Sequence, residues 1–136
     1  MSAKLEQKKI ALAKASKRSV EEIKHLYENT FEVNGDEYMV LSDEERKEAV
    51  IENIKESASY FSSSFLAGET ELPEIVFESL VDKNEAVVKI IEKLADGGIS
   101  GFAKRAVEAD GFGHFLNGYN GEEKELQNGF YAYQVG

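Results

Sequence analysis

Two Asn-Gly dipeptides, one near each end of the chain, place the strongest constraint on its fold. Asn34-Gly35 separates the alternating residues 31–33 from the β-rich run 38–41, and Asn128-Gly129 precedes the aromatic run 130–135. Asn-Gly between such runs is the strongest short-range hairpin signal, because both residues accept the positive φ of a tight turn. A hairpin alone is only marginally stable. The sequence therefore predicts that hairpins 31–41 and 122–135 join in one small antiparallel sheet.

Most of the remaining chain is predicted to be helical. Apolar residues at helical spacing indicate helices over residues 4–15, 20–29, 43–66, 73–81, 85–95 and 100–109. We expect an α+β fold in which the sheet packs against four to six helices. The length of 136 residues fits one domain, 1–136. Its basic N-terminal helix, within residues 1–18, is expected to attach loosely because it carries few strong hydrophobes.

The composition excludes several classes of site. The chain contains no cysteine, so disulfides, thiolate nucleophiles and cysteine-ligated metal centres are ruled out. No secretory leader follows Met1, and no apolar run approaches the length of a membrane span. We therefore expect a cytoplasmic protein without membrane association.

The net charge of −10 is distributed unevenly. Residues 1–25 carry seven Lys and Arg against three Glu, whereas the rest of the chain carries nine against twenty-three Asp and Glu. An acidic body repels nucleic acid and favours a basic partner. Pairing of the basic segment with the acidic body of a second copy would also give a dimer.

The first two predicted helices invite comparison with a helix-turn-helix motif. Ala13, Arg18 and Ile23 fall near the positions that such a motif fills, and the segment is basic. However, Glu21 and Glu22 would lie at the base-facing end of the recognition helix, where DNA phosphates repel them. A plain pair of structural helices is favoured, and direct binding of nucleic acid is disfavoured.

The run DGFGHFLNGYNGEEKE, followed by NGFYAY, is the most distinctive part of the sequence. It resembles the signature Asp-Gly-x-Gly-His-x-Leu-x-x-Tyr-x-Gly-Glu-Glu of a family of small, uncharacterised acidic proteins from bacteriophages and mobile elements. Phe112 and Gln134 depart from the family pattern, and both departures remove positive charge, which argues against a phosphate site. The family has no assigned activity, so the resemblance implies a phage-type context and a bacterial host cell, but no mechanism.

Two interpretations of this signature remain open. A histidine beside carboxylates can act as a general base or bind a metal, which would suit a small enzyme or a ligand-binding protein. Alternatively, Asp110 caps a turn and His114 ties the loop to the backbone. This structural interpretation is favoured, because short motifs often match by chance. We predict no catalytic residue, no cofactor and no metal ligand. The loop residues that could serve structure or a ligand are Asp110, Gly111, Gly113, His114, Tyr119, Gly121, Glu122 and Glu123.

The leading functional hypothesis is an acidic, non-enzymatic binding protein that acts stoichiometrically on a host protein, like phage-encoded inhibitors of host defence. If the carboxylates of the helix starting at Asp43 imitate DNA phosphates, the partner is a nucleic-acid-binding protein. An accessory protein that contacts nucleic acid through its basic N-terminal helices is a further alternative. The residues expected at the interaction surface are Glu45, Glu48, Glu52, Glu56, Tyr131 and Tyr133, the tyrosines because they commonly anchor interfaces.

Overall fold

The computed structural model describes residues 2–136 and has the α+β fold that the sequence predicts. These residues contain seven α-helices and one five-stranded antiparallel sheet. The chain divides into two compact units, residues 1–48 with 112–136, and residues 49–111. We call them the sheet unit and the helical unit. None of the described helices is long and apolar enough to cross a membrane.

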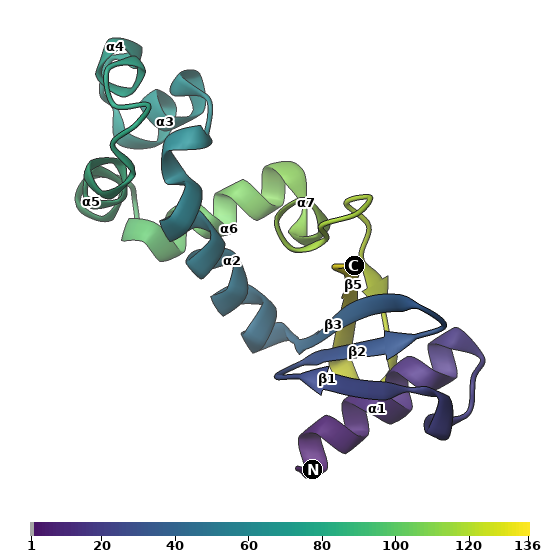
Figure 1. Cartoon of the computed structure of the whole chain (residues 1–136). Helices are drawn as coiled ribbons and strands as arrows, with labels where there is room; N and C mark the ends of the chain where they lie inside the picture. The colour runs from purple at the N-terminus through teal and green to yellow at the C-terminus, as the bar shows by residue number, and fades with distance from the viewer. Residues whose placement is uncertain (1) are drawn as a thin grey trace. The chain divides into compact units, whose positions relative to one another are not determined.

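The sheet unit contains both predicted hairpins (Figure 1). Its strands are β1 (Lys24–Tyr27), β2 (Thr30–Val33), β3 (Asp36–Ser42), β4 (Lys124–Glu125) and β5 (Phe130–Gln134), in the spatial order β1-β2-β3-β5-β4. Asn34 and Gly35 connect β2 to β3 with φ values of 53° and 87°, as a tight hairpin requires. Strands β3 and β5 pair antiparallel from Tyr38 opposite Gln134 to Ser42 opposite Phe130. This pairing joins the two hairpins into one sheet, as predicted.

The second hairpin differs from the prediction in the length of its first strand. Only Lys124 and Glu125 pair with β5, and the 3₁₀ helix η3 (Gln127–Gly129) follows. Asn128 and Gly129 again have positive φ, so the Asn-Gly signal marks the turn correctly. The residues before β4 belong instead to a hydrogen-bonded loop, which is described with the candidate site.

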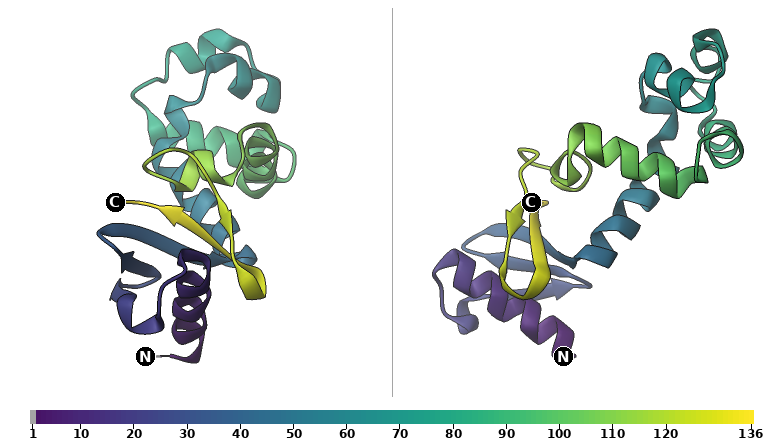
Figure 2. Two further views of the ribbon diagram at one scale, coloured as in Figure 1. Left: turned by 90° about the vertical axis from the view of Figure 1, so that its right-hand side faces the viewer. Right: turned by 180° about the vertical axis from the view of Figure 1, so that it is seen from behind.

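Helix α1 (Ala3–Ser16) packs on one face of the sheet (Figure 2). Leu12 and the sheet residues Phe31 and Val40 are at most 1% exposed. The helix is therefore part of the core of this unit, and the expectation of a loosely attached N-terminal helix is corrected. Its short side chains allow close approach to the sheet. The buried residues of this core are Ala11, Leu12, Ala13, Ile23, Phe31, Val33, Val40, Leu126, Phe130 and Ala132.

The helix predicted over residues 20–29 does not form. The 3₁₀ helix η1 (Val20–Glu22) is followed directly by β1, in which His25 pairs with Phe31 of β2. Helical spacing is a weak signal in so short a segment, and pairing with β2 overrides it while Ile23 becomes buried. The helix-turn-helix interpretation is therefore wrong, because its second helix is a strand.

The helix predicted over residues 43–66 is broken into three parts. Helix α2 (Asp43–Ser57) is followed by η2 (Ala58–Tyr60) and α3 (Ser63–Thr70). Ser57 donates its hydroxyl proton to the carbonyl of Asn53, and Ser62 caps α3 by accepting from the backbone N–H of Phe65. Serine hydroxyls compete with the helical hydrogen bonds in this way, so the serine-rich stretch ends one helix and begins another.

The helical unit begins within α2 and continues through η2 and α3 to α4 (Glu74–Glu78), α5 (Asn84–Leu94) and α6 (Gly98–Asp110). Phe61 and Phe65 pack edge-on against the buried ring of Phe102, with centroids 5.1 and 5.5 Å away. Asn84, at the start of α5, donates to the carbonyl of Lys55 and accepts from the backbone of Ser59. These contacts join the segment between α2 and α3 to helices α5 and α6.

Candidate functional site

The signature run begins with a short helix where the sequence suggested a loop. Asp110 ends α6 and Gly111 follows with a φ of 85°, after which α7 (Phe112–Leu116) makes little more than one turn. A β-carbon on Gly113 would lie 2.1 Å from the carbonyl oxygen of Gly121. Gly113 therefore lets the later part of the signature pack directly on α7, and Gly121 contributes its own positive φ of 75°.

Asn117 organises the loop between α7 and β4. Its side-chain oxygen accepts hydrogen bonds from the backbone N–H groups of Tyr119 and Asn120, at 2.7 and 2.9 Å. Its amide nitrogen donates to the carbonyl of Glu122 at 2.8 Å, and the side-chain oxygen of Asn120 accepts from the N–H of Glu122. Two asparagines thus satisfy the backbone of the turn, as Asx side chains commonly do.

The loop ends on Glu123, which reaches a cluster built around Arg46 of α2. The Nη1 atom of Arg46 lies 2.5 Å from Oε1 of Glu123, and its Nε and Nη2 atoms each lie 2.9 Å from Oδ1 of Asp43. The guanidinium lies between two rings, 3.9 Å from the centroid of Phe112 and 3.6 Å from that of Tyr131. Arginine suits this position because its flat guanidinium stacks on rings while its edge donates to carboxylates.

The hydroxyl of Tyr133 completes the Arg46 cluster by donating to Glu123. Burial, reinforced by the Glu123 carboxylate, raises the pKa of Tyr133 well above its usual range. Burial alone would lower the pKa of Arg46, but hydrogen bonds to Tyr133 and Asp43 raise it. Hydrogen bonds from Lys47 and Arg46 lower the pKa of Asp43. These pKa shifts favour a neutral Tyr133, a charged Arg46 and a charged Asp43 at neutral pH. We call Arg46 and the side chains around it (Asp43, Phe112, Glu123, Tyr131 and Tyr133) the clasp.

Four side chains of the signature form no hydrogen bond or ion pair with the Arg46 cluster. Asp110, His114, Tyr119 and Glu122 are exposed, and Tyr119 is 73% exposed. The ring of His114 meets Phe115 edge-on at 4.9 Å, but no hydrogen bond ties its imidazole to another described residue. The expected tie between His114 and the backbone is therefore replaced by the bonds of Asn117. The Asn117 and Asn120 bonds hold the loop, and Tyr119 and Glu122 within it are exposed to solvent.

A shallow polar pocket of about 120 Å³ lies beside the loop within the sheet unit. Its lining includes the carboxylate-bearing Glu122 and the ammonium-bearing Lys124, which lies 5.3 Å from the ring of Tyr38. The remaining lining residues are Asn117, Asn120, Ala132 and Gln134. No group of three or more His, Asp or Glu side chains among residues 2–136 is arranged to hold a metal ion.

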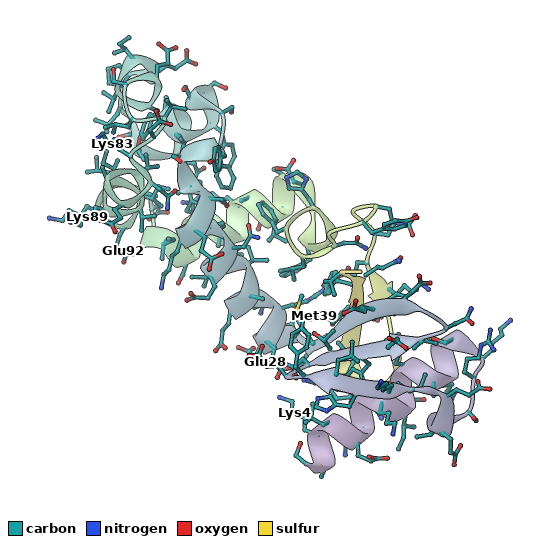
Figure 3. All side chains as sticks on the ribbon, in the orientation of Figure 1. Lys4, Glu28, Met39, Lys83, Lys89 and Glu92 are labelled. Atoms are coloured by element: carbon teal, nitrogen blue, oxygen red, sulfur yellow. The ribbon has the colours of Figure 1, made fainter. Side chains whose placement is uncertain are left out.

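The carboxylates expected on α2 lie in different surroundings. Glu45 is bound by Lys8, whose side chain is 1% exposed, and by Lys4 of α1 (Figure 3), at 2.8 and 3.2 Å. Glu48, Glu52 and Glu56 are exposed, and Glu52 faces Lys55 at 3.5 Å. The row therefore includes one carboxylate that is neutralised inside the sheet unit and one that is paired at the surface.

The two tyrosines expected on an exposed sheet face also differ. Tyr133 is fully buried and its hydroxyl bonds to Glu123 of the Arg46 cluster, so its expected place at an exposed surface is corrected. Tyr131 is half-buried beneath the guanidinium of Arg46. Sequence reasoning missed Arg46, Asn117 and the buried Lys8. Only the Asn-Gly and glycine-rich context of Asn117 could have pointed to its role, because the other two depend on contacts between distant segments.

Comparison with protein families, curated proteins and solved structures finds no match to this chain.

Proposed function

We propose that the chain is a non-enzymatic binding protein that acts stoichiometrically on a protein of the bacterial host, in the cytoplasm, in the manner of phage-encoded inhibitors of host defence. The observation that carries the proposal is the exposed Tyr119, presented by a loop that is fixed on both sides. The Asn117 bonds hold the turn at its start, and the ion pair of Glu123 with Arg46 holds its end.

A fixed loop lowers the entropic cost of binding, because the partner does not have to order it. Tyrosine adds a large contact area with only two rotatable side-chain bonds, which is why it is common at binding hot spots. His114 and Glu122 lie in the same short run and would supply polar contacts around it. The net charge of −10 favours a basic partner by attraction at long range.

Affinity purification of the tagged protein from a bacterial lysate at moderate salt, followed by mass spectrometry, tests this proposal. We expect one protein in near-equal amount with the bait, and its loss with Tyr119→Ala. Tyr27→Ala is the matched control, because Tyr27 is also exposed, at 57%, but lies on β1. Equal capture by wild type and Tyr119→Ala would contradict the loop as the binding element.

Imitation of DNA is a finer version of the same proposal, in which Glu48, Glu52 and Glu56 stand for phosphates. Pairing of Glu45 with Lys8 removes one carboxylate from that row. Reversal of Glu48 and Glu52 to lysine would abolish capture of a nucleic-acid-binding partner if the row is the contact. Unchanged capture would leave the loop as the contact and remove the mimicry.

The pocket beside the loop favours a second candidate, a protein that binds a small polar ligand. Glu122 and Lys124 line the pocket with opposite charges, and no ion pair joins them to each other or to another described residue. A bound metabolite would be retained through native purification and released on denaturation, where mass spectrometry would identify it. Loss of that ligand in Lys124→Met, with an unchanged melting temperature, would support this candidate over the protein-binding proposal.

A further inference from the structure

The helical unit has an open groove of about 460 Å³ that the signature loop does not use. One wall is the end of α3, with Gly68, Glu69 and Glu71, and the other contains Leu94 and Asp96 at the end of α5. The volume is within the range of about 300–1,000 Å³ that is usual for ligand sites. Leu94 is 50% exposed, so the groove offers a large apolar side chain to solvent.

Hydrogen bonds hold the walls of this groove together. Arg105 of α6 donates from Nε to Oε1 of Glu69 at 2.6 Å and from Nη2 to the carbonyl of Asp96 at 2.8 Å. A β-carbon on Gly101 would lie 2.1 Å from the same carbonyl, so α6 packs directly on this part of the chain. These contacts tie α6 to the end of α3 and to the segment after α5, which together line the groove.

The electrostatics of the groove favour a cation. Glu71 and Asp96 are exposed, and no hydrogen bond or ion pair joins either carboxylate to another described residue. Helices α3 and α5 both end here, and helix C-termini carry partial negative charge on their free carbonyl groups. Arg105 supplies one positive charge, but Glu69 already pairs with it. The two free carboxylates and the two helix ends remain unbalanced.

We infer that this groove binds an arginine side chain from a basic segment of a partner protein. The aliphatic stem would pack on Leu94, while the guanidinium would bond to the carboxylates of Glu71 and Asp96. Arginine combines these two properties and is common at the centres of interfaces. The inference rests on the proposed function only in assuming a protein partner, since the groove lies in the helical unit and Tyr119 lies in the sheet unit.

Amide NMR titration of the full chain with the peptide acetyl-Ala-Arg-Ala-Arg-Ala-amide tests the inference directly. We expect the largest shifts at Gly68, Glu71, Leu94 and Asp96. The same peptide with citrulline in place of arginine, which keeps the shape but not the charge, should bind at least about tenfold more weakly. Shifts centred elsewhere, or equal affinity for the citrulline peptide, would overturn the inference.

Two double variants distinguish binding at the groove from general attraction to the negative charge of the protein. Glu71→Gln with Asp96→Asn should weaken peptide binding about tenfold or more, because both carboxylates contact the guanidinium. Glu74→Gln with Glu78→Gln removes the same charge from the exposed residues of α4, which do not line the groove, and should change affinity less than about twofold. An equal loss of peptide affinity in both double variants would mean that the peptide is held only by the general negative charge of the protein, which would overturn the inference. This titration needs no captured partner, so its failure and that of the proposed function are distinguishable.

Discussion

Arg46 and Glu123 are 77 residues apart in sequence, and their side chains form an ion pair with Nη1 and Oε1 2.5 Å apart. This pair fastens the end of the signature loop to the start of α2. Phe112, in the first turn of α7, lies on one side of the same guanidinium. A single arginine thus connects three segments of the sheet unit, and several measurements can test how much it contributes.

Replacement of Arg46 by alanine should destabilise the protein strongly. The side chain is 13% exposed, and its loss would leave Glu123 beside Tyr133 without its cation. Because a third of the Glu123 side chain is exposed, we expect a loss of about 1–3 kcal/mol, less than for a fully buried pair. Arg46→Lys should recover only part of this, because an ammonium cannot stack between two rings and bond to both carboxylates. Urea unfolding of the three proteins measures the difference, and equal stability of wild type and Arg46→Lys would contradict the stacked geometry.

Replacement of Gly113 by alanine should displace the signature loop. The added methyl group would meet the carbonyl of Gly121 at 2.1 Å, and overpacking of this kind costs about 1–3 kcal/mol. Gly118→Ala is the matched control in the same loop, since its nearest neighbours lie 4.0 Å away. Thermal unfolding and the amide spectrum of residues 117–123 report the effect. Similar melting temperatures for the two variants would show that the loop does not pack on α7 as described.

Replacement of Tyr133 by phenylalanine isolates the hydroxyl of the cluster. The variant should lose about 1–2 kcal/mol at neutral pH, because Glu123 loses one of its two charge-assisted bonds but keeps Arg46. The folded-state pKa of Tyr133 is raised by burial and by Glu123, so the unfolded chain ionises first as the pH rises. Stability from this group is therefore present below about pH 10 and lost above it.

The loss of stability at alkaline pH should thus be steeper in wild type than in Tyr133→Phe. Unfolding curves at several pH values between neutral and alkaline measure the two slopes. Parallel profiles would indicate that the hydroxyl ionises equally in the folded and unfolded chains, against a buried bond to Glu123.

The contact between Lys8 and Glu45 predicts a loss of stability in acid. Burial alone would raise the pKa of Glu45, but hydrogen bonds from Lys8, the Ser42 backbone and Lys4 hold it at about 2. A carboxylate with a lowered folded-state pKa stabilises the fold above its unfolded pKa, and this contribution is lost as the pH falls towards 2. For a partly exposed group we expect roughly 2 kcal/mol after screening by solvent.

Lys8→Met tests the cause of that acid sensitivity. Methionine keeps most of the volume of the buried stem but removes the ammonium, so Glu45 should titrate nearer to its ordinary pKa. The variant should be less stable at neutral pH, and its stability should change less between pH 4.5 and 2 than that of wild type. Lys14→Met is the matched control, because it removes one ammonium from an exposed position of the same helix. An unchanged acid profile in Lys8→Met would exclude Lys8 as the main stabiliser of the Glu45 carboxylate.

The two hairpins, the α+β class and the start of α2 could be predicted from the sequence, because each depends on local chemistry. Asn-Gly pairs accept positive φ wherever they occur, and the capping box at Ser42 and Glu45 forms from residues three apart. Glycine and asparagine also marked the signature as a turn-rich element, although the short helix α7 within it was not predicted.

The tertiary structure decided the elements whose local preferences are weak or divided. Residues 24–27 carry a helical pattern but form β1, because pairing with β2 extends the sheet. Lys8 is of an ordinary surface type, yet it is buried because Asn29 and Glu45 from distant segments satisfy its ammonium group. Tyr133 is buried with its hydroxyl bonded to Glu123. Local sequence thus determined the turns and helix starts. Contacts between distant segments determined which polar groups joined the clasp and which, such as Tyr119, remained exposed. The physical reason is that a polar or charged side chain is buried only where a partner satisfies it, and sequence spacing alone does not reveal that partner.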